Sequence, residues 1–287
     1  MGIKKINLAI YPLFAFCFSQ TVIAKSWSRN EIFHNLKSIE ISNSLGDIVV
    51  IPSNDKDENT FVKMEGEGIN EVEVVRDGDD LLIKRLANKV LNHKPKRVDI
   101  TIHAASKVKN LACNMGKGDC SIERFTGDLA INSGNSNVFI KDIIGGVSLN
   151  TGGGKKVDIE NIKGNIALSA GSLKNGKMSN VVGNVDINTG SLNFSFFDVF
   201  GDISINGASG TLDYTASKKP EFPINIKVNG ASFDLNLNLS SDFKNISNKI
   251  KRLNIVSTFL PIVKHGGDIT FKGCLAWGSL NVKQIKN

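Results

Sequence analysis

A short phrase centred on glycine recurs at nearly constant spacing along the middle of the chain. It reads glycine, a small or polar residue, and then hydrophobic-x-hydrophobic, as in the GDLAI that begins at Gly127. The five copies begin at Gly127, Gly145, Gly164, Gly183 and Gly201, which are 18, 19, 19 and 18 residues apart. A unit this short cannot bury an apolar face by itself, so the spacing predicts a stack of repeats.

Each copy alternates between apolar and polar residues. The apolar positions lie seven, five and two residues before the glycine and two and four after it, and Gly176 is the one member that is not apolar. They are Cys120, Ile122, Phe125, Leu129, Ile131; Val138, Ile140, Ile143, Val147, Leu149; Val157, Ile159, Ile162, Ile166, Leu168; Gly176, Met178, Val181, Val185, Ile187; and Phe194, Phe196, Val199, Ile203, Ile205. Alternation with period two predicts strands with one buried face, stacked about 4.8 Å apart. We therefore predict an all-β, single-chain β-solenoid of about 18–19-residue coils, with irregular N- and C-terminal caps.

The corners of the predicted coils carry glycine, asparagine and aspartate. Glycines recur seven residues after the landmark, as at Gly134 and Gly171, where we expect a backbone conformation that suits glycine. Asx residues recur five after it, as at Asn188, and three before it, as at Asp142. Because Asx side chains bond to nearby polar groups at turns, we expect them to stack as ladders.

The flanks contain looser versions of the pattern. One more copy of the phrase surrounds Gly46-Asp47, and alternation resumes at residues 224–239 and 267–271. Phe243, Ile246, Ile250 and Leu253 recur at helical steps, which predicts a short helix or an ordered loop. The predicted organisation is an N-terminal β region and cap over 25–115, solenoid repeats over 116–219, and a C-terminal β region and cap over 220–287.

The first 24 residues have the features of a cleavable secretory signal peptide. Lys4 and Lys5 precede an apolar run that ends in Val22-Ile23-Ala24. The run is shorter than the ~20 residues that span a bilayer, so we expect no transmembrane anchor after cleavage. Cleavage would lower the net charge of +7 by the two lysines, and such a mild charge argues against nucleic acid as a partner. The predicted location is the periplasm, the cell envelope or the extracellular space.

The sequence contains no catalytic, cofactor-binding or metal-binding pattern. His34, His93, His103 and His265 lack metal-ligand spacing, and the glycine-lysine run at 152–156 lacks the other residues of a phosphate loop. Some β-helices cleave acidic polysaccharides with clustered outward carboxylates. Here the predicted outward positions of the repeats carry a sparse mixture of Asp158, Glu160, Lys141 and Asp186. We therefore predict no enzyme and no cofactor.

Three cysteines remain after signal cleavage. Counting back one repeat places Cys113 at an inward site, where it faces Cys120 across one coil. In an oxidising compartment this pair can form a disulfide, which leaves Cys274 unpaired, and the alternative is three buried thiols.

Two phenylalanines break the polar rule of the outward positions. Phe139 and Phe197 are predicted on the outer face of the same sheet, three coils apart, with Lys141 and Lys177 between and beside them. Exposed apolar patches often mark contact surfaces, so we predict a contact surface at Phe139, Lys141, Lys177 and Phe197. The alternative is that a cap or the segment 243–253 covers both rings as ordinary core.

The opening phrase IEISNSLGDIVVIPSNDKDENTFV and the later GDLAINSG, GNVDINTG and GDISINGA repeats resemble the bacterial "putative adhesin" family of unknown function. The resemblance covers about Ser38 to Lys283 and implies an exported, envelope-associated β-solenoid without known catalytic residues. The function that we expect is a non-catalytic cell-envelope adhesin or structural and binding scaffold, whose partner is an unknown envelope or surface protein or polysaccharide. The alternatives are a polysaccharide-active β-helix enzyme and a module that binds envelope components for a partner protein.

Overall fold

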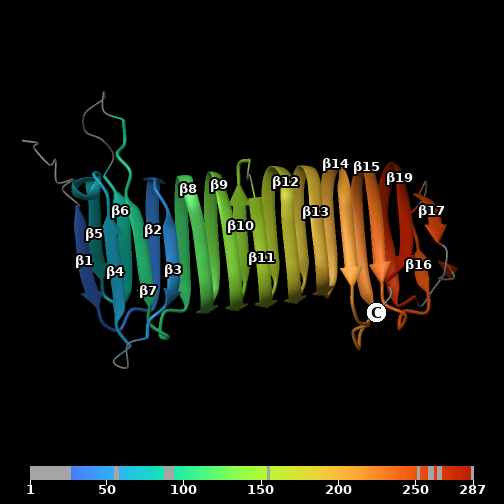
Figure 1. The fold of residues 1–287 in the computed structure, drawn as a ribbon, viewed down its shortest axis with the longest axis horizontal. Helices are drawn as coiled ribbons and strands as arrows, with labels where there is room; N and C mark the ends of the chain where they lie inside the picture. Colours follow the sequence, from blue (N-terminus) through green and yellow to red (C-terminus); the bar gives the residue numbers. More distant parts are fainter. Residues whose placement is uncertain are drawn as a thin grey trace, which may run out of the picture.

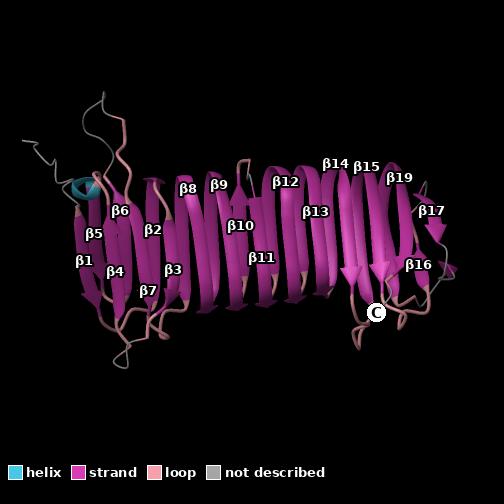
Figure 2. Cartoon of the chain, in the orientation of Figure 1, coloured by secondary structure: helices cyan, strands magenta, loops and turns pink. Residues whose placement is uncertain are grey.

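The computed structural model describes residues 27–54, 58–86, 94–153, 156–250, 253–257, 262–263 and 267–285. Within these residues nearly all regular structure is β-strand, and the helical part is one 3-10 turn at Ile69–Glu71 (Figure 2). This confirms the predicted all-β class. The described residues contain no helix long and apolar enough to cross a membrane. The predicted signal peptide lies outside the described residues.

The described residues form 19 strands that belong to one sheet wound into a stack (Figure 1). In chain order they are β1 Ser28–Phe33, β2 Ser38–Leu45, β3 Ile48–Pro52, β4 Thr60–Glu65, β5 Val72–Asp77, β6 Asp80–Arg85, β7 Asp99–Ala104, β8 Asn110–Thr126, β9 Asp128–Ile144, β10 Val147–Thr151, β11 Lys156–Lys163, β12 Ile166–Val182, β13 Val185–Phe200, β14 Asp202–Ala216, β15 Ile224–Leu239, β16 Ile246–Asn248, β17 Leu253–Ser257, β18 Ile262–Val263 and β19 Ile269–Gln284.

Parallel pairing joins each repeat to the next along the middle of the stack. β8 pairs with β9, β9 with β10 and β11, and these with β12, after which β13, β14 and β15 follow in order. Equivalent inward residues pair directly, so that Val147 lies between Leu129 and Ile166. The backbone bonds therefore hold residues of the same kind in columns that run along the stack.

The core of the stack is the set of inward side chains. Every inward position of the five copies is buried, as predicted. Gly176 interrupts the apolar pattern because the ring of Phe194 in the next layer fills its place. A Cβ at Gly176 would lie 1.9 Å from Phe194 Cδ2. The strand register shifts between Leu173 and Gly176, which accommodates this exchange.

Glycine and Asx residues form the corners, for two different reasons. Gly145 has a φ of +147°, and its Cα lies so close to the layer below that a Cβ would meet Gly127 O at 2.0 Å. Gly171 has no positive φ, contrary to the expectation for glycines seven after the landmark, but a Cβ there would lie 2.4 Å from Gly152 O. Close stacking, rather than backbone conformation, requires glycine at this second corner.

The predicted Asx ladders are present. Asn161 Nδ2 donates to Asp142 Oδ1 at 2.7 Å, and Asn180 Nδ2 donates to Asn161 Oδ1 at 3.0 Å. At the other corner Asn206 Nδ2 donates to Asn188 Oδ1 at 3.1 Å. The ladders satisfy side-chain donors and fix the register between layers.

At both ends of the stack, the strand order in space differs from the order along the chain. At the N-terminal end, β2 and β3 lie between β8 on one side and β6 with β7 on the other. β4 then pairs with β7, and β1 with β4, in antiparallel fashion. At the C-terminal end, β19 lies between β15 and the short strands β16 and β17.

The segment after β15 differs from its sequence-based prediction. Instead of a helix or a loop throughout, the chain forms the three-residue strand β16, which pairs with β19. Phe243, Ile246 and Ile250 are buried against the end of the core. Leu253 begins β17. Pairing with the open edge of β19 determines the conformation here, and the helical spacing of the apolar residues does not.

Asp268 ties this C-terminal region together. Its carboxylate accepts the Lys244 backbone N–H at 2.7 Å and forms an ion pair with Lys219 Nζ at 2.7 Å. Burial raises the pKa of Asp268, but these bonds outweigh burial and hold the pKa below its ordinary value. The ionised carboxylate therefore stabilises the fold.

A charge introduced at an inward position should destabilise the fold, whereas a charge at an outward position should not. Ile131 is 1% exposed and Ala130 is exposed. Ile131→Asp should lower the free energy of unfolding by several kcal/mol because the carboxylate is buried without a partner. Ala130→Asp should change it by about 0.5 kcal/mol or less. Thermal unfolding compares the two, and equal melting temperatures would contradict the register.

Asp268→Asn should lower the free energy of unfolding near neutral pH by about 1–3 kcal/mol, since it removes charge-assisted bonds. A carboxylate with a depressed pKa stabilises above its unfolded pKa, and this contribution is lost as the pH falls below about 4. The difference in melting temperature between wild type and variant should thus shrink in acid. Asp186→Asn, at an exposed site, serves as the control and should change the melting temperature little at neutral pH.

Candidate contact surface

The four predicted surface residues lie in two neighbouring columns on the outer side of one sheet. Phe139 on β9 pairs with Asp158 on β11, which pairs with Lys177 on β12. In the next column, Lys141 is followed by Glu160, Ser179 and then Phe197 on β13. We call this outer surface of β9, β11, β12 and β13 the contact face.

Phe139 is half-buried by its neighbours on the contact face. Lys156 Nζ lies 5.0 Å from the centroid of the Phe139 ring and 3.4 Å from a carboxylate oxygen of Asp158. Lys141 forms an ion pair with Glu160 at 3.6 Å. Lys177 is exposed and has no ionic partner among the described residues. One end of the contact face therefore combines an aromatic ring with lysines and carboxylates, and two of the lysines are already paired with these carboxylates.

Phe197 is the more exposed of the two rings. Its side chain is 41% exposed, whereas the adjacent Phe196 is buried and packs 4.9 Å from Phe194. The segment 243–250 lies at the C-terminal end of the stack, where β16 pairs with β19. Phe197 is thus accessible, and its exposure follows from the strand alternation that directs Phe196 inward.

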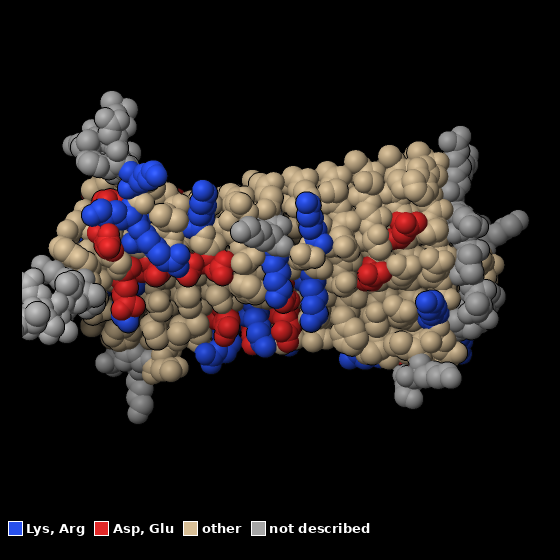
Figure 3. Space-filling view, turned by 45° about the horizontal axis from the view of Figure 1, so that its top comes forward, with Lys and Arg blue, Asp and Glu red and all other residues tan. Residues whose placement is uncertain are grey.

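Charged side chains are unevenly spread over the surface. In the view of Figure 3, lysine and arginine are interleaved with aspartate and glutamate over the N-terminal and central strands. Fewer charges appear toward the C-terminal strands in that view. Charge of both signs in close alternation makes a surface for polar partners rather than a single-sign field.

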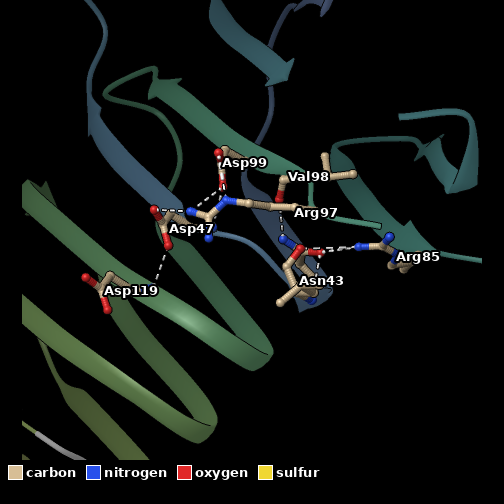
Figure 4. Close-up of polar contacts among 8 residues, drawn as sticks. Asn43, Asp47, Arg85, Arg97, Val98, Asp99 and Asp119 are labelled. Atoms are coloured by element: carbon tan, nitrogen blue, oxygen red, sulfur yellow. Dashed lines mark hydrogen bonds and ion pairs between the residues drawn. The ribbon is translucent and has the colours of Figure 1, made fainter. Parts of the chain in front are cut away.

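A second polar cluster, which sequence reasoning missed, lies at a corner near the N-terminal end (Figure 4). Asp99, Asp47 and Asp119 come from three successive layers, and Arg97 lies over the first two. The Asp47 N–H donates to Asp99 Oδ1 and the Asp119 N–H donates to Asp47 Oδ1, both at 2.8 Å. In the sequence, the two Gly-Asp pairs, Gly46-Asp47 and Gly118-Asp119, could have indicated part of this cluster. Nothing in the order of the chain indicates that Asp99 lies in the neighbouring layer.

The bonds of this aspartate corner are structural. Arg97 Nη2 lies 2.5 Å from Asp47 Oδ2 and 2.9 Å from Asp99 Oδ1. The hydrogen bond with Asp99 raises the pKa of Arg97. The carboxylates of Asp99 and Asp47 thus each cap a backbone N–H of the next layer, and both form ion pairs with Arg97. We assign no chemistry to this corner.

A buried arginine lies beside the aspartate corner. Arg85 Nη2 donates to Glu71 Oε2 at 2.8 Å, and Arg85 Nη1 donates to Leu45 O at 3.3 Å. Figure 4 shows Arg85 beside Asn43, whose Oδ1 accepts from Arg85 Nη1 at 3.4 Å. Asn43, also buried, donates from Nδ2 to Val98 O at 2.8 Å. The charge and the donors of Arg85 are therefore engaged within the protein.

The remaining sequence candidates are separate from one another. His34 and His103 lie in the N-terminal part, while His93, His265 and residues 154–155 of the glycine-lysine run lie outside the described residues. Within the described residues no three His, Cys, Asp or Glu side chains form a group that could hold a metal ion. Asp158 and Glu160 each pair with a lysine.

Cys113 and Cys120 are buried and contact each other within the coil that β8 forms. Cys274 is exposed, so the alternative of three buried thiols is wrong for this residue. A hydrogen bond with Cys120 raises the pKa of the Cys113 thiol, and burial raises it further. Both groups are free thiols in this structure. Burial keeps both thiols away from reagents in solution, and the raised pKa makes Cys113 still less reactive.

The geometry defines the class of protein: an all-β scaffold of stacked parallel strands with a mixed-charge outer face. The chain belongs to the toastrack family DUF4097, whose model matches residues 36–272. This confirms the resemblance found in the sequence. No curated protein matches the chain.

Several solved structures are similar along nearly their whole length. A "putative adhesin" from Bacteroides fragilis is 14% identical, with a TM-score of 0.46 over 91% of this chain and 98% of that one. A "putative lipid binding protein" from Parabacteroides distasonis is 15% identical, with a TM-score of 0.44 over 92% and 98%. A "putative cell adhesion protein" from Clostridium sporogenes is 13% identical, with a TM-score of 0.22 over 91% and 100%.

The thiols make a direct prediction. In the native mature chain, a thiol reagent should modify Cys274 and leave Cys113 and Cys120 unmodified. After denaturation without reductant, three thiols should react. A Cys274→Ser variant should show no reaction in the native state. A count of one thiol in the denatured wild type would instead show a disulfide between Cys113 and Cys120.

Proposed function

We propose that this protein is exported to the cell envelope, periplasm or cell surface and serves there as a non-catalytic adhesive or binding scaffold. The N-terminal lysines, apolar run and small-residue cleavage site support export. We propose stacked coils of 18–19 residues with distinct caps as the scaffold. Pairings such as Leu129 with Val147 and Val147 with Ile166 support that length.

The observation that carries this proposal is the exposed aromatic surface on the contact face. Phe197 is exposed where alternation calls for a polar residue, and Phe139 lies in the adjacent column under Lys156. A rigid sheet holds these groups in a fixed arrangement, so binding orders few side chains. We propose Phe139, Lys141, Lys177 and Phe197 as the residues that contact an envelope or surface component.

A polysaccharide-cleaving role has less support. Such chemistry needs a pair of carboxylates, one of them with an altered proton affinity, on either side of a substrate bond. On the contact face, Asp158 and Glu160 are each held by a lysine ion pair. The aspartates of the aspartate corner bond to backbone N–H groups and to Arg97. These carboxylates serve the fold, which favours binding over catalysis.

The double variant Phe139→Ser, Phe197→Ser tests the proposal. Because both rings lie on the outer side, the melting temperature should change little, while the protein should move from envelope fractions to the soluble fraction. Ala130→Ser with Ala167→Ser, at exposed positions away from the contact face, should leave both properties unchanged. A large loss of stability would assign the rings to the core, and unchanged fractionation would place binding elsewhere.

A further inference from the structure

The first strand of the described chain forms an open edge at the N-terminal end of the stack (Figure 1). Among the described residues β1 pairs with β4 along one side, from Ser28 opposite Glu65 to Phe33 opposite Thr60, and with no other strand. The opposite end differs, since β16 and β17 pair with parts of the outer side of β19. An open edge presents unpaired N–H and C=O groups that can pair with another strand.

The hydrogen-bond pattern shows which residues of β1 face that edge. Gly66 N–H donates to Trp27 O at 3.1 Å, and this pair continues the register of β1 with β4. In an antiparallel ladder the bonded residues alternate, so Trp27, Arg29, Glu31 and Phe33 bond toward β4. The N–H and C=O groups of Ser28, Asn30 and Ile32 consequently point outward.

Apart from the charges of Arg29 and Glu31, β1 lacks the features that usually protect an edge. Its sequence, SRNEIF, contains no proline, lysine or glycine, and its six residues form a regular strand. Ile32 is 57% exposed on the outer side. Natural edges are commonly blocked by proline, lysine or a bulge. This edge is therefore suited to pairing.

The charges of β1 are self-complementary. Arg29 and Glu31 lie on either side of Asn30 and point to the same side of the strand. Within one chain they form an ion pair, and Arg29 Nη1 donates to Val72 O at 3.3 Å, yet both side chains remain partly exposed. If a second β1 pairs antiparallel with Asn30 opposite Asn30, each Arg29 lies opposite the Glu31 of the other copy.

We propose that β1 is a homodimerisation edge, at which two copies of this chain pair antiparallel about a two-fold axis through Asn30. The backbone N–H and C=O groups of Asn30 then bond to those of Asn30 in the second copy. Those of Ser28 bond to Ile32 of the second copy. The four charges of Arg29 and Glu31 alternate in sign at the non-bonded positions, where side chains lie closest. The dimer joins two stacks through their N-terminal ends.

Charge selects this register over its neighbours. The residues whose N–H and C=O groups face the edge must pair with the equivalent residues of the second copy. The two nearest alternative two-fold registers therefore place the axis at Arg29 or at Glu31. Those registers set Arg29 opposite Arg29 or Glu31 opposite Glu31. Like charges directly opposite destabilise a strand pair. The axis at Asn30 avoids both.

A charge-swap experiment on the exported mature chain, which begins near Lys25 if the signal is removed, tests the proposal. Sedimentation should show a dimer for the wild type. Arg29→Glu and Glu31→Arg should each raise the dimer dissociation constant about tenfold or more, because every opposite-charge pair becomes a like-charge pair. Mixing the two variants should restore dimers, since each chain then faces its complement. Lys63→Glu on β4 is the control and should leave the dimer intact.

Two further variants test the edge and the register. Asn30→Pro removes an outward N–H and places a ring at the edge without removing a bond to β4, so it should give a stable monomer. In a Cys274→Ser background, Asn30→Cys should cross-link to itself on oxidation, whereas Ser28→Cys should not. A monomeric wild type, a dimer insensitive to Asn30→Pro, or charge variants that fail to recombine while remaining folded would each overturn the proposal.

Discussion

The structure depends on the close parallel approach of one coil's backbone to the next. At the landmark corner a Cβ on Gly145 would lie 2.0 Å from Gly127 O, and one on Gly164 would lie 2.0 Å from Gly145 O. That approach lets equivalent residues pair, so Asx side chains meet in ladders and inward side chains form continuous columns. Loss of the register at one corner would misplace every side chain of the following strand.

Because alternation separates the two sides of each strand, the core and the surface are specified by different residues. Phe194 and Phe196 complete the interior, and the space for Phe194 comes from Gly176 in the layer below. Phe197, one position further, contributes to the surface. In a fold of this type, the residues of the outer face can change while the inward columns stay the same.

The sequence predicts the repeated part well because its interactions connect neighbouring repeats. Inward sites such as Ile131 and ladders such as that from Asp142 to Asn180 follow from the period alone. Strand order at the ends does not follow from the period. Asp99 stacks on Asp47 because β7 pairs with β3, and β16 is a strand because β19 offers it an edge. The sequence predicts which residues lie on the contact face. It does not predict that Lys141 and Lys156 pair with Glu160 and Asp158, because these ion pairs depend on side-chain conformation.

At the two ends of the stack, the spatial order of the strands differs from their order in the chain. This difference limits where repeats can be added in evolution. β2 and β3 already have neighbours on both sides, and so does β19 over much of its length. A repeat appended beside either of these segments would find its place occupied. A duplicated repeat inserted between β8 and β15 would instead meet matching columns above and below. Longer and shorter members should therefore differ in the number of central layers and keep the same two ends.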